Sequence, residues 1–181
     1  MVLTVPDLHD DVVALRPPTP SDVGAITAAV QDPEIPRFTH VPAPYTAVDA
    51  VAFVGKAASS WRDGTDASFL VVDRTSGVLL GSVGLQKLDA VPGEAHVGYW
   101  VDAAARRRGV ATRALRLVTT WAFETLGLER LQAQVFTDNP WSQRVLEQAG
   151  FRRVPDAPAA VEHAAGPRPA FVYSRSRDAA D

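Results

Sequence analysis

The sequence predicts an α/β (α+β) fold in which a mixed, mostly antiparallel sheet of six to seven strands is flanked by about four helices. Two observations predict it. Apolar residues alternate with a period of two over short segments that end at turn residues, and longer segments show the period of amphipathic helices. The chain of 181 residues is long enough to bury one core and shows no internal repeat, so we expect a single domain over 1–181.

The N-terminal part predicts one strand and two helices. The strand covers Val12 to Arg16, and the first helix covers about Val23 to Gln31. Prolines then interrupt the helical pattern, so 37–45 is expected to be an irregular loop. A Thr-x-x-Asp capping box opens the second helix over about 46–61.

The middle of the chain changes to the period of strands. Segments Ser68 to Asp73 and Val78 to Gln86 flank a Thr-Ser-Gly turn, which is typical of a hairpin. A third strand over Glu94 to Val101 places Glu94 and His96 on the same face, because side chains alternate along a strand.

A basic loop then passes directly into a helix. Arg106 to Arg108 and Gly109 precede an amphipathic helix that runs to about Leu126. The first turn of a helix has backbone N–H groups without partners and carries the positive end of the helix dipole, so it suits a phosphate. Arginines add charge-assisted hydrogen bonds, and glycine lets a ligand approach the backbone. This stretch indicates an anion site, although basic loops are also often plain solvated surface.

The last third predicts a strand, a capped helix and two further strands. A strand over Glu129 to Thr137 leads to a helix with Asn139 as N-cap, Pro140 at its first position and Gly150 after its end. Shorter features complete the chain: strands at Phe151 to Val154 and Phe171 to Ser174, a loop over 155–169 and a tail over 175–181. The last strand is expected to be exposed, where it could pair between two copies in a homodimer.

Composition excludes several classes of function. Cysteine is absent, which excludes disulfides, cysteine-based zinc sites and an acyl-cysteine intermediate, and the dispersed histidines predict no metal site. The first residues lack the pattern of a signal peptide, and no apolar run approaches transmembrane length, so we expect a cytoplasmic protein without membrane contact. Net charge is −3, yet 106–153 holds nine arginines against four carboxylates, which favours a local anionic ligand and no specific nucleic-acid partner.

Three motifs resemble the GCN5-related N-acetyltransferase (GNAT) superfamily. The run Arg106-Arg107-Arg108-Gly109-Val110-Ala111 is similar to its Gln/Arg-x-x-Gly-x-Gly/Ala pyrophosphate loop. Asn139-Pro140-Trp141-Ser142, followed by Ala149-Gly150-Phe151, resembles its Asn-x-x-Ser and Gly-Phe segment. Val97-Gly98-Tyr99-Trp100-Val101 and Leu15-Arg16-Pro17 resemble the ribosomal-protein alanine N-acetyltransferase (RimJ/RimL-like) branch. The likeness covers about 12–154, whereas P-loop and dinucleotide fingerprints do not fit.

The resemblance implies an acetyl-CoA (or other acyl-CoA) donor between the strand ending at Val101 and the strand ending at Phe136. The residues that it implies for donor binding are Trp100, Val101, Asp102, Arg106, Arg107, Arg108, Gly109, Val110, Ala111, Thr112, Asn139 and Ser142. An acceptor amine would attack the thioester directly, in agreement with the absence of cysteine.

Two steps of the reaction need proton transfer. The superfamily often has a glutamate two residues before the Gly-Tyr-Trp run, and here that position is His96. We hypothesise that His96 is the base, with Glu94 as helper or alternative; both could instead only line the cleft. Ser142 is the candidate acid for the leaving thiolate, although a serine near a helix start also often bonds backbone.

The resemblance therefore implies an acetyl-CoA-dependent N-acetyltransferase acting on a protein N-terminus or a small-molecule amine. The alternatives are an antibiotic-modifying acetyltransferase and a non-catalytic acyl-CoA-binding regulatory module, which the histidine at position 96 leaves open. Aromatic residues are candidates for the acceptor wall, with core packing as the alternative for the first three: Tyr99, Trp100, Trp141, Trp61 and Phe38.

Overall fold

The computed structural model describes residues 3–155, 157 and 159–178. The strands are β1 (Leu8–His9), β2 (Val13–Arg16), β3 (Ala67–Asp73), β4 (Leu79–Gln86), β5 (Glu94–Val101), β6 (Arg130–Phe136), β7 (Arg152–Arg153), β8 (Ala159–Val161) and β9 (Arg168–Ser176). The helices are α1 (Val23–Ala29), α2 (Glu34–Phe38), α3 (Ala47–Asp63), α4 (Val110–Glu124) and α5 (Pro140–Gln148), with 3-10 turns at Pro20–Asp22 and Ala103–Ala105.

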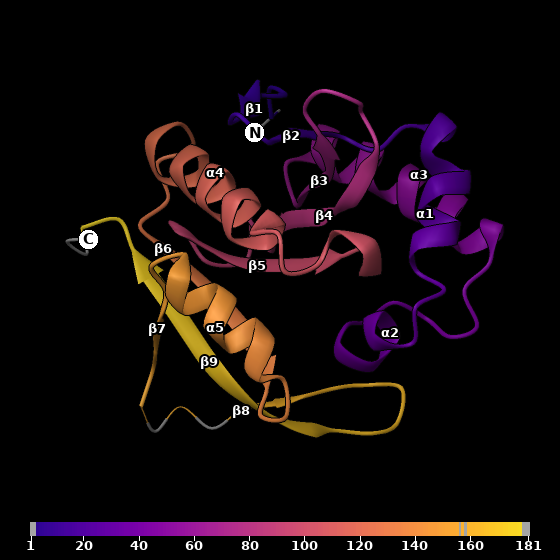
Figure 1. Cartoon of the computed structure of the whole chain (residues 1–181). Helices are drawn as coiled ribbons and strands as arrows, with labels where there is room; N and C mark the ends of the chain where they lie inside the picture. The colour runs from indigo at the N-terminus through magenta and orange to yellow at the C-terminus, as the bar shows by residue number, and fades with distance from the viewer. Residues whose placement is uncertain (1–2, 156, 158, 179–181) are drawn as a thin grey trace.

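The described strands form one sheet in the order β1-β2-β3-β4-β5-β6-β9-β7, with β8 paired to β9 (Figure 1). Every neighbouring pair is antiparallel except β5 with β6. The expected α/β class and mostly antiparallel sheet are confirmed. Over the described residues the sheet has more strands than the expected six to seven, since β1 and β8 add to its edges.

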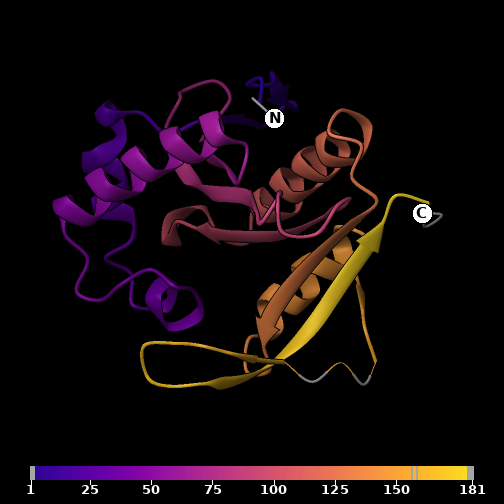
Figure 2. The same cartoon turned by 180° about the vertical axis from the view of Figure 1, so that it is seen from behind.

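Helices cover both faces of the sheet. Helices α4 and α5 lie on one face, and α1 and α3 lie on the other (Figures 1 and 2). Strand β3 shows how the sequence achieves this, because Phe69 and Val71 pack in the core beneath α4, while Leu70 and Val72 pack against α1 and α3. The continuous apolar run of β3 therefore reflects a strand that is buried on both faces.

Trp61 belongs to the core and not to an acceptor wall. Its ring centroid lies 5.1 Å from that of Phe69 and 5.8 Å from that of Trp121, and its indole N–H donates to the carbonyl of Ser68 at 3.0 Å. The side chain is buried at the end of α3, where the aromatic cluster joins α3 to α4 through the end of the sheet. The expectation that it walls the acceptor site is wrong.

Helix α2 forms inside a segment that the prolines were expected to break. Pro36 occupies the first turn of α2, where a backbone N–H has no partner within the helix, so its missing donor costs nothing there. The carboxylate of Asp32 accepts the N–H of Glu34 at 3.1 Å and starts the helix. The irregular loop predicted from residue 37 therefore begins only after Phe38.

The C-terminal segment is more ordered than the sequence indicates. Strand β8 lies within the expected loop 155–169, and β9 extends through Ser176 into the expected tail, of which 179–181 lie outside the described residues. Strand β9 pairs with β6 along one edge and with β7 and β8 along the other. The strand at Phe171 is therefore interior to the sheet, so the expectation that its exposed edge pairs in a homodimer is wrong.

Strands β5 and β6 separate soon after they begin. They pair at three positions, from Glu94 with Arg130 to His96 with Gln132. Beyond them, β6 remains paired with β9 as far as Phe136, while β5 remains paired with β4 as far as Val101. The C-terminal halves of the two parallel strands therefore diverge, and main-chain groups of β5 face a gap.

A charged pair fixes the connection between β2 and α1. The guanidinium of Arg16 donates to both carboxylate oxygens of Asp22 at 2.8 and 2.6 Å, and the N–H and hydroxyl of Thr19 donate to the same carboxylate at 2.8 Å. These bonds, with Arg16 the strongest, lower the pKa of Asp22 to about 2. This contact explains why the Leu-Arg-Pro run has an arginine.

We expect Asp22→Asn to destabilise the fold by about 2 kcal/mol at pH 7. The pKa of Asp22 is lower in the folded than in the unfolded chain, so its contribution is complete above about pH 4 and is lost as the pH falls toward 2. Urea unfolding at pH 7 and pH 3 measures the difference, with the exposed Asp63→Asn as control. A loss that is equal at both pH values would contradict the ion-pair explanation.

Candidate active site

A cavity of about 450 Å³ lies where β5 and β6 separate. The C-terminal parts of β4 and β5 supply one wall, and the end of β6 with the first turn of α5 supplies the other. The segment from Phe38 to Tyr45 and the first half of α3 cover it from the α3 side of the sheet. It therefore reaches both the α3 side and the α5 side of the sheet.

His96 lies on the α3 side of β5 and lines the cavity. It is directly opposite Gln86 of β4 and Gln132 of β6 in the strand register. Partial burial and the nearby charge of Lys87 lower the pKa of His96, and Glu94 opposes this shift. The imidazole is therefore neutral at neutral pH and has a free lone pair, as a proton acceptor requires.

Glu94 shares the face of His96 but has other partners. Its carboxylate lies 3.4 Å from the guanidinium of Arg130 and accepts the side-chain amide N–H of Gln132 at 3.3 Å. It is not among the described residues that line the cavity. The structure therefore brings Glu94 near His96 but directs its carboxylate toward β6.

Ser142 and Tyr99 meet on the α5 side of the gap. Their hydroxyl oxygens are 2.7 Å apart, and the phenol of Tyr99 also lies within hydrogen-bonding distance of the Ser142 carbonyl, at 3.2 Å. Burial raises the pKa of Tyr99 above its ordinary value, so the phenol stays protonated. The side chain of Ser142 is thus held by another side chain, whereas Asn139 accepts the N–H of Ser142 at 3.1 Å as the predicted N-cap.

The alternation of backbone bonds decides which groups of β5 face the gap. The N–H of Asp102 donates to the carbonyl of Leu80 in the strand next to it, at 2.9 Å. Because residues of a strand bond to alternate sides, the main-chain groups of Tyr99 and Val101 point away from β4 and toward the gap. The side chain of Asp102 also has a partner within the protein, because its carboxylate accepts the N–H of Ala104 at 2.8 Å.

The loop before α4 has an unusual backbone. Arg107 and Gly109 both have a left-handed conformation, with φ of 59° and 75°. Nothing described lies within 4 Å of where a Cβ at Gly109 would be, so the backbone is open to a ligand on that side. Gly109 is the N-cap of α4, and Val110, Ala111 and Thr112 form the first helical turn with its unpaired N–H groups.

The arginines around this loop differ in their surroundings. Arg107 and Arg108 are exposed, and the Arg107 guanidinium lies 5.7 Å from the ring centre of Trp141. Arg106 instead pairs with Asp32 and donates to the carbonyl of Val101 at 3.3 Å. Arg113 pairs with two aspartates near the N-terminus. The positive charge that faces solvent at the loop therefore comes mainly from Arg107 and Arg108.

The remaining candidates divide between cavity and surface. Trp100 and Phe38 line the cavity, whereas Trp141 is exposed and lies outside the lining. His40 also lines the cavity, and His163 forms a 2.8 Å hydrogen bond with the carbonyl of Pro36. The scattered positions of these histidines in the sequence do not indicate either contact. In the described part of the chain no cluster of three His, Cys, Asp or Glu side chains could hold a metal ion, and no helix has the length and apolar character to cross a membrane.

The contact between Tyr99 and Ser142 is the feature that sequence reasoning missed. Period-two alternation places Tyr99 on the face opposite His96, and the N-cap pattern places Ser142 in the first turn of α5. Neither signal says that two residues 43 positions apart in the chain share a hydrogen bond.

Comparison with known proteins identifies a family and similar sequences. A family model described as an acetyltransferase (GNAT) domain matches residues 13–152. YoaA, an uncharacterised N-acetyltransferase of Bacillus subtilis (strain 168), is 28% identical over 148 residues, which cover 82% of this chain and 84% of YoaA.

Two solved structures share the fold. The ribosomal-protein-S5-alanine acetyltransferase of Vibrio fischeri has a TM-score of 0.83 at 19% identity, covering 96% of this chain and 98% of its own. RimJ of Mycobacterium smegmatis, solved in complex with CoA-disulfide, has a TM-score of 0.81 at 20% identity, covering 96% of this chain and 87% of its own. The family match extends from β2 to the start of β7 and includes the β4, β5 and β6 walls of the cavity, the loop before α4 and the start of α5, so the chain belongs to the GNAT acetyltransferase family.

Proposed function

We propose that the protein transfers an acetyl group from acetyl-CoA directly to a primary amine. The observation that carries this proposal is the gap between β5 and β6, which has a neutral histidine on one side and a serine hydroxyl on the other. Membership of the GNAT family supports the reaction type, and the CoA-disulfide in RimJ supports the donor. The kinship with ribosomal-protein acetyltransferases also supports action in the cytoplasm.

The donor is proposed to enter the gap from the loop before α4. Its pyrophosphate would accept N–H groups from the turn 108–112, where Gly109 leaves the approach open. Arg107 and Arg108 would add charge from the exposed side. The amide groups of the pantetheine arm would pair with the main chain of Tyr99 and Val101, because these face the gap, while Trp100 contributes its side chain and Asn139 lies across the gap.

Transfer then needs one proton to leave the amine and one to reach sulfur. The amine nitrogen attacks the thioester carbonyl, the bond to sulfur breaks, and the acetyl group passes to nitrogen. His96 accepts the amine proton on the α3 side, directly or through water. Ser142 donates its proton to the thiolate on the α5 side and regains one from solvent, while the hydrogen bond between the hydroxyls of Ser142 and Tyr99 holds the serine side chain in position.

The cavity favours a compact acceptor. Most of its lining is aliphatic or aromatic, including Phe38, Tyr45 and Phe53. Among the described lining residues Asp49 supplies the one carboxylate, and this carboxylate already accepts two bonds from Thr46 at 2.8 and 2.6 Å. A polycationic antibiotic would need more negative charge, so a protein N-terminus or a small apolar amine fits better.

An amine panel tests the function. We expect CoA thiol release, corrected for hydrolysis, to depend on the acceptor and to be faster with apolar amines or peptides with a free N-terminus than with polyamines and aminoglycosides. Tight acetyl-CoA binding without acceptor-dependent release would instead support the non-catalytic module. Release that is fastest with aminoglycosides would support the antibiotic-modifying alternative.

We expect His96→Ala to lower kcat/KM by about 100-fold and to remove one limb of the pH profile. The lowered pKa of His96 keeps the base neutral below the ordinary histidine value of about 6.5, so in the wild type this limb should lie below that value. The profile is measured with two acceptors whose amine pKa values differ. The limb that belongs to the acceptor amine should move between them, whereas the limb that belongs to His96 should stay in place.

Glu94→Ala tests the alternative base, and His9→Ala is the control for the loss of a histidine. A profile that is unchanged in both His96→Ala and Glu94→Ala would reject the base role for either residue. A loss in Glu94→Ala alone would assign the base to the carboxylate.

We expect Ser142→Ala to lower kcat by about 100-fold and Tyr99→Phe by about tenfold. If the two hydroxyls act together, the double variant should be no slower than Ser142→Ala, because the effects of groups that act as one unit do not add. Tyr173→Phe, which removes a nearby phenol and its 3.2 Å bond between β9 and Glu147 of α5, is the control for loss of a hydroxyl outside the cavity. Full turnover by Ser142→Ala would refute the acid role.

A further inference from the structure

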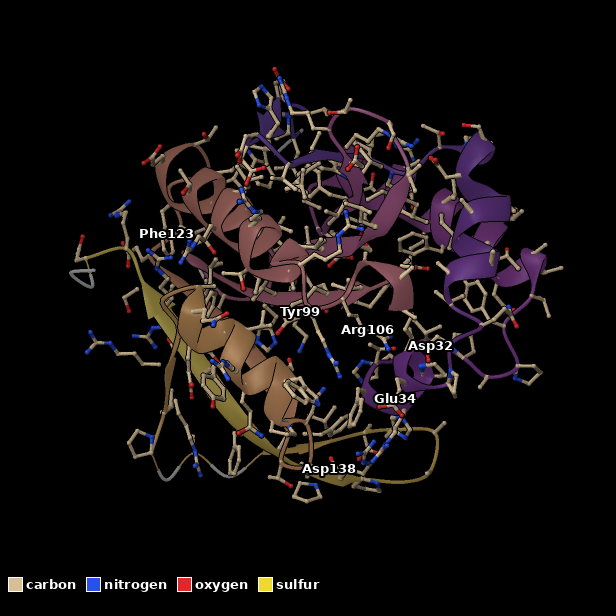
Figure 3. All side chains as sticks on the ribbon, in the orientation of Figure 1. Asp32, Glu34, Tyr99, Arg106, Phe123 and Asp138 are labelled. Atoms are coloured by element: carbon tan, nitrogen blue, oxygen red, sulfur yellow. The ribbon has the colours of Figure 1, made fainter. Side chains whose placement is uncertain are left out.

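Arg106 is turned away from the surface on which the neighbouring arginines lie. One of its terminal nitrogens forms an ion pair with the carboxylate of Asp32, and its Nε donates to the Val101 carbonyl at 3.3 Å. Figure 3 shows Arg106 pointing toward Asp32 at the start of α2. Arg107 and Arg108, by contrast, are exposed.

Asp32 serves two elements with one carboxylate. One oxygen pairs with Arg106, and the other accepts the backbone N–H of Glu34 at 3.1 Å, which starts α2. The Asp32 side chain is 16% exposed, so it is largely removed from water. If Arg106 left to bind a phosphate, this carboxylate would lose its cation in a poorly solvated place, which is costly.

Helix α2 leads directly into the covering wall of the cavity. Ile35 anchors the helix in the core at 2% exposure, and Phe38, Thr39 and His40 at its end line the cavity. The contact between Arg106 and Asp32 therefore joins the loop after β5, where the donor is proposed to bind, to the wall that faces the acceptor.

We propose that Arg106 is a positioning residue that fixes α2 through Asp32 and so shapes the acceptor side of the cavity, and that its guanidinium is not a phosphate ligand. The backbone of the loop and the exposed Arg107 and Arg108 hold the donor. This inference rests on the proposed function, since it assigns the two sides of the cavity to donor and acceptor.

Asp32→Asn and Arg106→Gln distinguish the two roles of Arg106. Asparagine keeps the oxygen that starts α2 but loses the charge, so folding should persist. We expect both variants to raise the acceptor KM by about fivefold or more, with the Kd for CoA within about twofold of wild type. The double variant should be no worse than either single variant, because both remove the same contact.

The opposite pattern would overturn the proposal. If Arg106 binds phosphate, Arg106→Gln should weaken CoA binding by about tenfold, while Asp32→Asn should leave it unchanged or tighten it. An acceptor KM that is unchanged in both variants would equally overturn it. Arg113→Gln, which breaks ion pairs between α4 and Asp10 and Asp11 in the turn between β1 and β2, is the matched control and should leave the acceptor KM unchanged.

Hydrogen exchange supplies a readout that does not need turnover. We expect Asp32→Asn and Arg106→Gln to speed amide exchange in 34–40 and Arg113→Gln not to do so. If the wild type transfers no acetyl group to any amine, the proposed function fails, yet exchange in α2 still tests the link. Unchanged exchange in both variants would refute the link by itself.

Discussion

The unequal pairing of the two edges of β6 is the constraint on which the site depends. Strand β6 can pair along two edges, and its pairing with β9 runs from Arg130 to Phe136, whereas its pairing with β5 ends after three positions. Strand β6 stays beside β9 to Phe136 while β5 stays beside β4 to Val101, so β5 and β6 diverge between two separately paired halves of the sheet. The cavity is thus a consequence of strand pairing and does not require a strained or irregular backbone in either strand.

The diverging strands leave main-chain groups that need partners. An unpaired N–H or C=O that is removed from water costs free energy comparable to a lost hydrogen bond. Tyr99 and Val101 carry such groups at the gap, and one of them, the Val101 carbonyl, is already used by Arg106. An extended ligand with amide groups, such as the proposed pantetheine arm, would satisfy the remainder in the manner of an added strand. In the proposed binding mode the reactive end of that ligand would lie beside Ser142.

The sequence predicted local features well, because their causes are local. The Thr46 capping box, the Asn139 N-cap and the bounds of β5 depend on residues within a few positions of each other, and the structure confirms them. The predictions failed where distant segments decide. Pro36 was interpreted as a helix breaker, although a proline in the first turn is compatible with a helix. Strand β8 was missed because the hairpin with β9 stabilises it more than its own pattern of residues does.

The same division applies to the candidate site. The glycine and the helix start of the donor loop are evident in the sequence, but the three consecutive arginines are equivalent there. The structure separates them, because Asp32 is 74 positions from Arg106 in the chain and becomes its neighbour only through the packing of α2. A residue's charge can be read from sequence, whereas whether that charge is available to a ligand depends on its partner.

The placement of the two candidate proton carriers on opposite sides of the sheet constrains the order of events. His96 is on the α3 side of β5, and Ser142 with Tyr99 is on the α5 side. The proposed base and acid are therefore two separate groups, unlike a single histidine that shuttles a proton. If His96 and Ser142 act as proposed, the thioester lies in the gap while the amine approaches from the α3 side, and donor and acceptor are bound together. This arrangement supports the proposed direct transfer within a ternary complex, which needs no covalent intermediate, in agreement with the absence of cysteine.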